Sequence, residues 1–444
     1  MKILVVTNLY PPRVLGGYEL AAEKIVAGLR GRGHDVRVLT SPAWQPVREE
    51  GVERTLALRA YQRVAPTSSS VNTLFQYESK ASQLDNTLVL LAALRRHRPD
   101  RVLVFNVIGL GGIALLDLVR RSGVPWVWNL GDRVPGVLLE DLDPELLAPL
   151  EPGAAFASGS ASVVSRTLAS EIADEGVALG PVEVIPRGVR PHGIVRGRDY
   201  RAGGVTRFTA ASVLTEFKGV GLIVDAAARL RREGRTFEVT VFGSGDVEAW
   251  RRRAEEAGVG DVVRFPGFVG QRELVEAHAE ADAFLFPTWG REPGASAPFE
   301  AASVGAVPIV TRDCGPAESL HDGVDSLLID RDVDALASAM RAVVDGDVDL
   351  ASLGAAGIAL TSGPLAADTS LERLEKFLRE TGADRPDRVD DPALDEHVLD
   401  AHDRVVEGVA ARIRADEDAW ARSLAPAPAS RALLRRGIRR PPAN

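Results

Sequence analysis

Two glutamates, Glu292 and Glu300, stand on either side of a run of small residues, with seven residues between them. They follow a short apolar segment, Ala283–Phe286, whose length and composition predict a strand. Pro298 favours the first turn of a helix, so we expect Glu292 in a loop and Glu300 in the next helix. Backbone N–H groups at such a helix start can bind an anion or a sugar. One glutamate alone is usually a solvated side chain, whereas this pair around a small-residue turn favours a binding site.

Lys218 is a candidate binding residue, because lysine is rare in this chain. Only five of the 53 basic residues are lysines, and Lys218 lies between an expected strand and an expected helix. A compact positive charge at that position suits a phosphate group. A solvated side chain is the alternative interpretation.

Two further turns between a strand and a helix consist of small residues. Gly16 and Gly17 follow the first expected strand, and Gly243-Ser244-Gly245 follows a later one. Glycines let the backbone approach a ligand closely, so both turns are candidate parts of a site. A plain tight turn explains either of them equally well.

Short apolar segments alternate with segments of helical spacing along the 444 residues. The expected strands are Lys2–Thr7, Val36–Leu39, Arg101–Phe105, Trp126–Leu130, Val163–Val164, Val182–Ile185, Phe208–Ala211, Val239–Phe242, Val262–Phe265, Ala283–Phe286, Val307–Val310 and Ser326–Ile329. This alternation predicts βαβ units and parallel sheets. The pattern restarts after Arg187–Gly204, so we expect two similar α/β halves divided near residue 190. Open sheets of this kind bind ligands beyond the carboxyl ends of their strands, where the turns above lie.

The C-terminal region differs from the two halves. Leu371–Arg379 is predicted to be a short amphipathic helix, and a polar linker follows over 381–393. One face of a further helix is expected to carry Val398, Val405, Val409, Ile413 and Trp420. We expect that helix to pack on the body of the protein or on a partner. The arginine-rich end, Ser430–Asn444, is typical of a disordered tail, although a basic tail can also contact an anionic surface.

Composition narrows the class of protein. The chain is 45% hydrophobic and 26% charged, which is typical of a folded globular protein. No apolar run reaches the roughly 20 residues of a membrane span, and the N-terminal run is too short for a signal peptide. A single cysteine, Cys314, excludes an intramolecular disulfide and fits a reducing cytoplasm. The net charge of −9 argues against nucleic acid as a partner. We therefore expect a cytoplasmic protein.

Taken in order along residues 1–380, these motifs resemble the GT-B glycosyltransferases of the retaining family 4. The matching segments are Gly16-Gly17-Tyr18-Glu19, Gly33-His34-Asp35-Val36, Val184-Ile185-Pro186, Lys218-Gly219, Gly243-Ser244-Gly245, Phe265-Pro266-Gly267-Phe268-Val269, Phe286-Pro287-Thr288, Glu292 with Glu300, Pro308-Ile309-Val310 and Gly315-Pro316-Ala317-Glu318. The resemblance implies two Rossmann-like parallel-sheet domains that face each other across a cleft. Residues 1–190 would form the acceptor domain and 191–370 the nucleotide-sugar donor domain. Residues 371–444 would form a crossing helix, a helical extension and the basic tail.

The resemblance also implies roles for individual residues. Glu300 would hydrogen-bond the ribose hydroxyls, Glu292 would hold hydroxyls of the transferred sugar, and Lys218 would neutralise the pyrophosphate. Gly16 and Gly17 would close over the donor from the other domain. The other implied donor-site residues are Gly243 and Ser244, Phe268 and Val269 beside the base, and Gly294, Ala295 and Ser296 with N–H groups toward the sugar or phosphates.

Two positions depart from the family pattern. Val213 stands where an arginine is common, so the second phosphate cation is either missing or supplied from elsewhere, with Arg187 and Arg291 as the candidates. Gly131 stands where a histidine commonly contacts the sugar. The next residue, Asp132, could orient the acceptor nucleophile as a base or hydrogen-bond acceptor, or could merely cap a turn.

The function implied by the resemblance is transfer of a sugar from a nucleoside diphosphate sugar with retention of configuration. Front-face attack needs no protein nucleophile, and we expect no metal ion and no cofactor. Arginine, alanine and glycine usage is typical of a GC-rich genome such as that of an actinobacterium. A small natural product is the expected acceptor, because it fits the acidic chain and the departures from the family pattern on the acceptor side. A cell-wall or lipid glycan acceptor is an alternative. A non-catalytic nucleotide-sugar-binding homologue that scaffolds a partner, or a homodimer formed through the C-terminal extension, also remains open.

Overall fold

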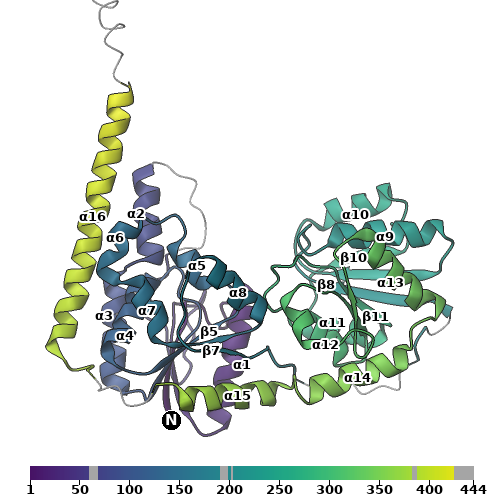
Figure 1. Ribbon diagram of the computed structural model, residues 1–444, viewed down its shortest axis with the longest axis horizontal. Coiled ribbons are helices and arrows are strands. Elements are labelled where there is room, and N and C mark those ends of the chain that lie inside the picture. The colour runs from purple at the N-terminus through teal and green to yellow at the C-terminus, as the bar shows by residue number, and fades with distance from the viewer. Residues whose placement is uncertain (60–68, 191–198, 202–203, 383–387, 425–444) are drawn as a thin grey trace, which may run out of the picture.

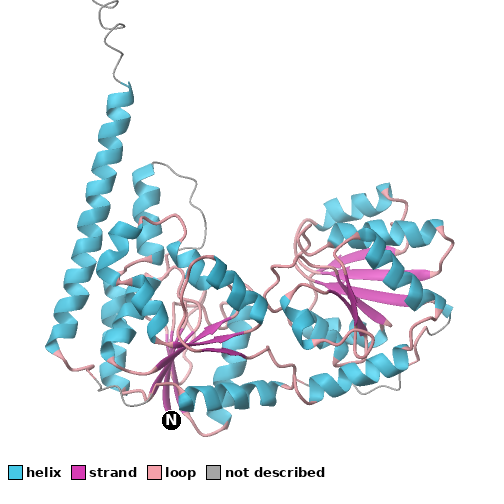
Figure 2. Cartoon of the chain, viewed as in Figure 1, coloured by secondary structure: helices cyan, strands magenta, loops and turns pink. Residues whose placement is uncertain are grey.

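The structure is a computed structural model that describes residues 1–59, 69–190, 199–201, 204–382 and 388–424. Two lobes lie side by side, and each consists of a sheet covered by helices on both faces (Figures 1 and 2). All strand pairs are parallel, as the alternation of strands and helices predicts. The expected α/β architecture is therefore confirmed.

The N-terminal lobe contains a seven-stranded sheet of order β3-β2-β1-β4-β5-β6-β7. Its strands are β1 (Lys2–Val6), β2 (Asp35–Leu39), β3 (Val52–Glu53), β4 (Arg101–Val104), β5 (Trp126–Leu130), β6 (Ser160–Val163) and β7 (Val182–Val184). Its helices are α1 (Gly17–Gly31), α2 (Ser69–Lys80), α3 (Leu84–His97), α4 (Gly112–Ser122), α5 (Val134–Leu139), α6 (Pro144–Leu147), α7 (Pro152–Ser158) and α8 (Arg166–Asp174). The last four residues of β1 are all buried, as a strand covered on both faces requires.

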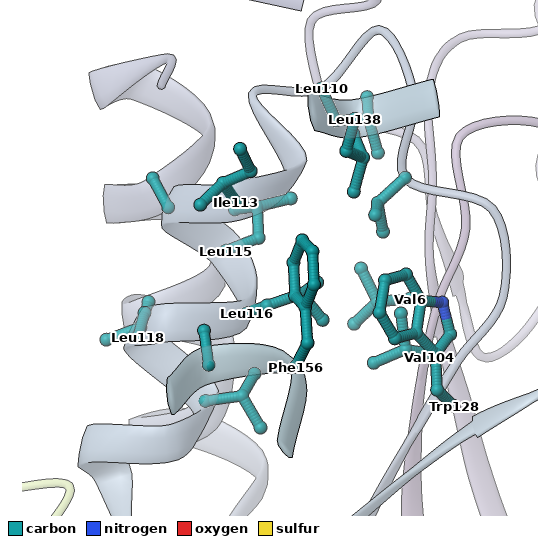
Figure 3. Close-up of a cluster of buried hydrophobic side chains, with 14 of the residues drawn as sticks. Val6, Val104, Leu110, Ile113, Leu115, Leu116, Leu118, Trp128, Leu138 and Phe156 are labelled. Atoms are coloured by element: carbon teal, nitrogen blue, oxygen red, sulfur yellow. The ribbon is translucent and has the colours of Figure 1, made fainter. Parts of the chain in front are cut away.

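Large apolar side chains fill the space between this sheet and its helices (Figure 3). Trp128 of β5 lies 5.3 Å from Phe156 of α7, measured between ring centroids. The indole N–H of Trp128 donates to the carbonyl of Phe105 at 2.9 Å, so its only polar atom is satisfied in the core. Leu116 of α4 packs in the same cluster. This core fixes the carboxyl ends of β4 and β5, from which the loops of the site emerge.

The C-terminal lobe contains a six-stranded sheet of order β10-β9-β8-β11-β12-β13. Its strands are β8 (Thr206–Ala211), β9 (Phe237–Phe242), β10 (Val263–Gly267), β11 (Ala283–Phe286), β12 (Val307–Thr311) and β13 (Leu327–Ile329). Its helices are α9 (Val220–Arg232), α10 (Val247–Glu256), α11 (Gln271–Glu280), α12 (Ala297–Ala302), α13 (Val333–Asp345) and α14 (Leu350–Ser362). The strand order reverses between β8 and β11, which makes a topological switch point where ligands of such sheets bind.

The chain then returns to the N-terminal lobe through α15 (Ala367–Glu380), which begins ahead of the expected boundary at residue 371. Leu371, Leu374 and Leu378 of α15 join the same apolar cluster as Val26 and Leu29 of α1. Gly28 of α1 permits this contact, because a Cβ at that position would overlap the side chain of Leu371. The crossing helix is thus part of the packing of the N-terminal lobe, as Figure 1 shows below the two lobes.

The C-terminal extension is a single helix, α16 (Pro392–Leu424), which lies against the outer helices of the N-terminal lobe (Figure 1). Its buried side chains are Leu394, Val398, Ala401, Val405 and Val409, and Ile413 packs beside them. Asp395 accepts two hydrogen bonds from Arg95, at 2.9 and 2.6 Å. The interpretation of a helix packed on the body is confirmed. The side chain of Trp420 and the tail Ser430–Asn444 lie outside the described residues.

Several helices have no counterpart in the sequence pattern. α14 has small residues, mostly alanine and glycine, around its whole circumference, so no apolar stripe marks it. α5, α6 and α7 are each at most seven residues long and begin with proline in the first turn. Such short helices depend on local turn chemistry and tertiary contacts, and hydrophobic periodicity cannot reveal them.

Candidate functional site

The loops that follow β8 and β11 meet at the switch point of the C-terminal lobe. Lys218, in the first loop, forms an ion pair with Glu292, in the second, through Nζ and Oε2. Glu292 is only 4% exposed, so its charge is compensated by the lysine rather than by bulk water. The two residues that the sequence singled out separately are therefore in direct contact.

Gly219 allows these two loops to approach each other. Its φ is +76°, and a Cβ at this position would overlap the carbonyl oxygen of Pro287. The backbone N–H of Trp289 donates to the carbonyl of Phe217 at 2.9 Å, which joins the loops a second time. The Lys218–Glu292 pair is thus held by the backbone of both loops.

Glu300 lies on α12, as expected from Pro298 in the first turn. Its two carboxylate oxygens accept hydrogen bonds from Ser296 Oγ at 2.9 Å and Gln271 Nε2 at 3.1 Å. Gln271 is the first residue of α11, immediately after the segment that contains Phe268 and Val269. The carboxylate is thereby fixed in orientation beside that segment. Phe268 is 81% exposed, so its ring is available to a flat ligand.

The loop between Glu292 and Glu300 rests against the N-terminal lobe. A Cβ on Gly294 would lie 2.6 Å from the side chain of Val164, at the end of β6. The backbone N–H groups of Gly294, Ala295 and Ser296 make no hydrogen bond to any residue of the described chain. Three N–H donors therefore remain unused next to the buried Glu292.

Arg291 and Glu318 connect the two lobes beside this loop. Arg291 forms an ion pair with Glu171 of α8. The carboxylate of Glu318 accepts from the backbone N–H groups of Arg166 and Thr167, at 2.8 and 2.6 Å, at the start of the same helix. These contacts satisfy free N–H groups of the first turn of α8. Arg291, one of the two candidate phosphate cations, is consequently engaged in an ion pair with the other lobe.

In the N-terminal lobe, Gly16 and Gly17 begin α1. The carboxylate of Glu19 accepts from the N–H of Gly16 at 2.8 Å, which satisfies one of the free N–H groups at the start of the helix. The hydroxyl of Tyr18 donates to the carbonyl of Asn129 at 2.6 Å and accepts from the N–H of Gly131 at 3.1 Å. Tyr18 thereby joins the loop after β1 to the loop after β5.

Arg187 lies between these loops. Its guanidinium carbon lies 5.8 Å from the centre of the Tyr18 ring. Burial lowers the pKa of the Arg187 guanidinium, while Tyr18, Glu292 and Asp132 act in the opposite direction. The guanidinium makes no ion pair or hydrogen bond with any side chain in the described part of the chain. It is a cation without an anionic partner.

Asp132 is exposed and accepts a hydrogen bond from the N–H of its neighbour Arg133 at 2.8 Å. This contact is the turn-capping role that was one of its two interpretations. Its role toward an acceptor stays a prediction.

The turn Gly243-Ser244-Gly245 lies at the end of β9. Gly243 has a φ of +147° and abuts the carbonyl oxygen of Ser212, so a side chain there would overlap the backbone. The carbonyl of Ser244 accepts from the N–H of Leu214 at 2.8 Å. These contacts account for the glycine by packing, and a contact with the donor stays a prediction.

A cavity of about 320 Å³ lies between the lobes. Its lining includes Gly17 and Arg187 on one side and Gln271, Ser296 and Glu300 on the other. The sequence did not point to Gln271, although its place at a helix start, two residues after Val269, is a usable signal. Within the described ranges, no three His, Cys, Asp or Glu side chains are grouped as metal ligands. No described helix is long and apolar enough to cross a membrane.

Two Rossmann-like lobes with a site at the carboxyl ends of their strands define the GT-B class of protein. The family model described as "Glycosyl transferase 4-like domain" matches residues 16–188, and the one described as "Glycosyl transferases group 1" matches residues 206–345. The chain belongs to family 4 of the GT-B glycosyltransferases.

Relatives of known name agree with this assignment. A GDP-mannose-dependent alpha-(1-6)-phosphatidylinositol monomannoside mannosyltransferase of Mycobacterium tuberculosis is 32% identical over 228 residues, which are 47% of this chain and 59% of that protein. The match thus spans about three fifths of that relative. The glycogen synthase of the same organism is 28% identical over 366 residues, 78% of this chain and 86% of that protein.

Solved structures share the fold. Sucrose-phosphate synthase from Thermosynechococcus elongatus superposes with a TM-score of 0.66 at 17% identity, over 85% of this chain and 98% of that one. Anabaena HepE in complex with UDP and glucose superposes with a TM-score of 0.61 at 18% identity, over 85% and 99%. At these identities the likeness concerns the fold alone.

Proposed function

We propose that this chain is a retaining glycosyltransferase that moves a sugar from a nucleoside diphosphate sugar to an acceptor. The observation that carries the proposal is the Lys218–Glu292 pair at the switch point of the C-terminal lobe. Membership of family 4 supports it, as do a relative named for GDP-mannose and a structural neighbour that holds UDP and glucose.

Lys218 and Glu292 have different tasks in the proposed reaction. In the absence of donor, the ammonium group compensates the buried carboxylate. A diphosphate would draw Lys218 toward itself and free Glu292 to accept hydrogen bonds from sugar hydroxyls. Glu300 would accept from the ribose hydroxyls in place of Ser296 and Gln271.

The chemical step is a front-face substitution. The bond from the anomeric carbon to the phosphate oxygen breaks, the acceptor oxygen bonds to the same face of that carbon, and its proton passes to the departing phosphate. The free N–H groups of Gly294, Ala295 and Ser296 would stabilise the charge that grows on the leaving group. No protein nucleophile, metal ion or cofactor takes part.

The acceptor belongs to the N-terminal lobe in this proposal. Asp132 would orient the acceptor hydroxyl by accepting its hydrogen bond, until the proton passes to the departing phosphate. A small natural product is one acceptor class. A lipid-linked glycan is the second, favoured by the phosphatidylinositol mannoside relative and by the exposed Leu15 and Trp44, which follow β1 and β2 and are 64% and 71% exposed. A non-catalytic scaffold is disfavoured by the intact pair of Lys218 and Glu292.

Thermal stability in the presence of UDP, GDP, ADP and dTDP tests the proposal. A nucleotide at 100 times its dissociation constant should add about 2.7 kcal/mol to the free energy of unfolding. One clear shift that is lost in Glu300→Ala, followed by turnover of the matching sugar nucleotide, would support a donor site. No shift with any nucleotide would favour the scaffold.

A further inference from the structure

The guanidinium of Arg187 occupies space that a side chain at Gly131 would need. A Cβ built on Gly131 overlaps Nη2 of Arg187, and a Cβ built on Gly17 lies 3.2 Å from Nη1. Two glycines from two different loops therefore bound the same head group. The ring of Tyr18 lies on a third side.

A glycine is required at position 131 because the Arg187 guanidinium occupies the space of a side chain, and not because of the backbone conformation. Its φ lies outside the left-handed region, in contrast to Gly219 and Gly243. Of the three atoms nearest to its added Cβ, two belong to the guanidinium of Arg187, and the third is Cε2 of Tyr18 at 3.2 Å. An alanine at 131 is thus compatible with the backbone conformation. Its methyl group would overlap the end of the flexible Arg187 side chain and require a slight shift of the Tyr18 ring.

No acidic side chain of the described residues forms an ion pair with Arg187. Glu292 lies near enough to affect its pKa, but Glu292 already forms its ion pair with Lys218. A partly buried guanidinium without an anionic partner is costly, and it gains most from a ligand that supplies the missing charge. The cavity between the lobes is lined by Arg187 and also by Glu300 and Ser296 of the donor site.

We propose that Arg187 binds an anionic oxygen group of the donor in this cavity, and that Gly131 keeps the space for it. The inference rests on the proposed function and adds to it a specificity-determining residue. A planar guanidinium binds phosphate or carboxylate oxygens through two parallel hydrogen bonds. The group comes either from the diphosphate, where Val213 supplies no cation, or from a carboxylate on the transferred sugar.

Calorimetric titration of the full chain tests this assignment. The probes are pyrophosphate, UDP, GDP, UDP-glucose, UDP-glucuronate, GDP-mannose and GDP-mannuronate. We expect Arg187→Ala to weaken binding about tenfold or more, as loss of a charge-assisted hydrogen bond does, and Arg187→Lys to weaken it less. The matched control Arg252→Ala removes an exposed arginine of α10 and should change nothing.

The two sources of the anion separate in the same data. If Arg187→Ala loses affinity equally for UDP and for both UDP-sugars, the diphosphate binds Arg187. If the loss of affinity is confined to UDP-glucuronate or GDP-mannuronate, the carboxylate of the sugar binds Arg187.

Gly131→Ala provides an independent test. The added methyl group should displace the guanidinium and weaken binding by a similar factor, with little change in melting temperature. In the Arg187→Ala background the same substitution should have no further effect, because the group it displaces is absent.

Two results would overturn the inference. In the first, Arg187→Ala binds every probe with an affinity within twofold of the wild-type value. In the second, the wild-type protein binds none of the probes. If Arg187→Ala behaves as wild type while Glu300→Ala loses nucleotide binding, the inference fails and the proposed function stands. If binding depends on Arg187 but no sugar nucleotide is turned over, the inference stands and the proposed function fails.

Discussion

Glu292 illustrates how a buried charge can serve both stability and binding. Its carboxylate is removed from water and has Lys218 as its ion-pair partner. Removing one member of a buried pair leaves an uncompensated charge, which usually costs more than removing both. The same pair is the proposed contact with the diphosphate and the sugar. Variants of the pair should therefore affect the free energy of unfolding and the turnover of the donor to different extents.

Lys218→Met should lower the free energy of unfolding by about 3 kcal/mol, since Glu292 is left buried without a partner. The double variant Lys218→Met/Glu292→Gln should recover most of that stability and remain inactive. Urea denaturation measures the first quantity and donor turnover the second. Lys376→Met, on an exposed lysine of α15, is the control and should stay within about 0.5 kcal/mol of wild type. A double variant as unstable as the single one would contradict the ion-pair account.

Helices α15 and α16 supply apolar and charged contacts that complete the N-terminal lobe. α15 covers α1, and α16 covers the outer helices. Each is amphipathic, so its apolar face would be exposed without the lobe beneath it. The stability of the lobe should therefore depend on residues that lie beyond the C-terminal sheet in the sequence.

Two neighbouring valines of α16 form a matched pair for measuring its packing. Val405 is 2% exposed and Val406 is 43% exposed. Val405→Ala should destabilise the protein by about 2 kcal/mol, because the removed methyl groups are fully buried. Val406→Ala should have an effect below about 0.5 kcal/mol. Equal effects in urea denaturation would mean that α16 does not pack on the lobe in solution.

Glu375 joins α15 to the N-terminal lobe electrostatically. Hydrogen bonds from Arg379 on its own helix and then from His34 and Arg32, at 3.0 Å each, lower the pKa of the Glu375 carboxyl to about 2. A folded-state pKa below the ordinary value of 4.5 means that the stabilisation is present above pH 4.5 and is lost as the pH falls toward 2.

Glu375→Gln should therefore lower stability at pH 7 by at most about 1 kcal/mol and flatten the acid limb of the stability curve. Thermal unfolding between pH 2 and pH 7 measures both effects. Glu372→Gln, on the exposed side of the same helix, should leave the curve unchanged. An unaltered acid limb in Glu375→Gln would refute the assigned pKa.

How far the fold follows from sequence depends on the kind of signal. Strands such as Trp126–Leu130 and Ala283–Phe286 were predicted with their observed bounds, because a buried parallel strand is a continuous apolar run. Glu292, Glu300 and Lys218 were recognisable from residue type and neighbouring turns. The fit of Arg187 against Gly131 was not, because it arises only when loops from distant parts of the sequence are brought together.

At the scale of the whole molecule, the lobes touch through the first turn of α8. Glu318 of the C-terminal lobe accepts hydrogen bonds from Arg166 and Thr167 there. This contact lies beside the loop that carries Glu292, so it can align the two halves of the site. Closure of such a cleft excludes water from the reacting groups.

Glu318→Ala should reduce sugar transfer about tenfold and raise the share of donor that is hydrolysed, because misaligned lobes admit water. Affinity for the nucleoside diphosphate, whose proposed contacts lie mainly in the C-terminal lobe, should change less than twofold. Product analysis with a labelled donor measures both. Glu256→Ala on the exposed end of α10 is the control. Unchanged partition between transfer and hydrolysis would contradict the alignment role.

Treatment with EDTA should leave both transfer and nucleotide binding unchanged, since the proposed step uses N–H groups, Lys218 and Arg187 in place of a metal ion. Rates measured before and after dialysis against the chelator, with magnesium added back, test this. A rate that falls and is restored by magnesium would contradict the metal-free step.

The chain crosses between the lobes twice, near Val189 and again near Leu365, and these two segments lie side by side. Val189 donates its N–H to the carbonyl of Leu365 at 2.9 Å, and Ala367 donates to the carbonyl of Val189 at 2.9 Å. A protease that cuts either passage alone would therefore leave two fragments still joined by the other. Residues 1–190 expressed by themselves would lack α15 and expose the apolar surface of α1. A soluble N-terminal lobe thus requires α15 as well, so this lobe is assembled from two segments that the C-terminal lobe separates in the sequence.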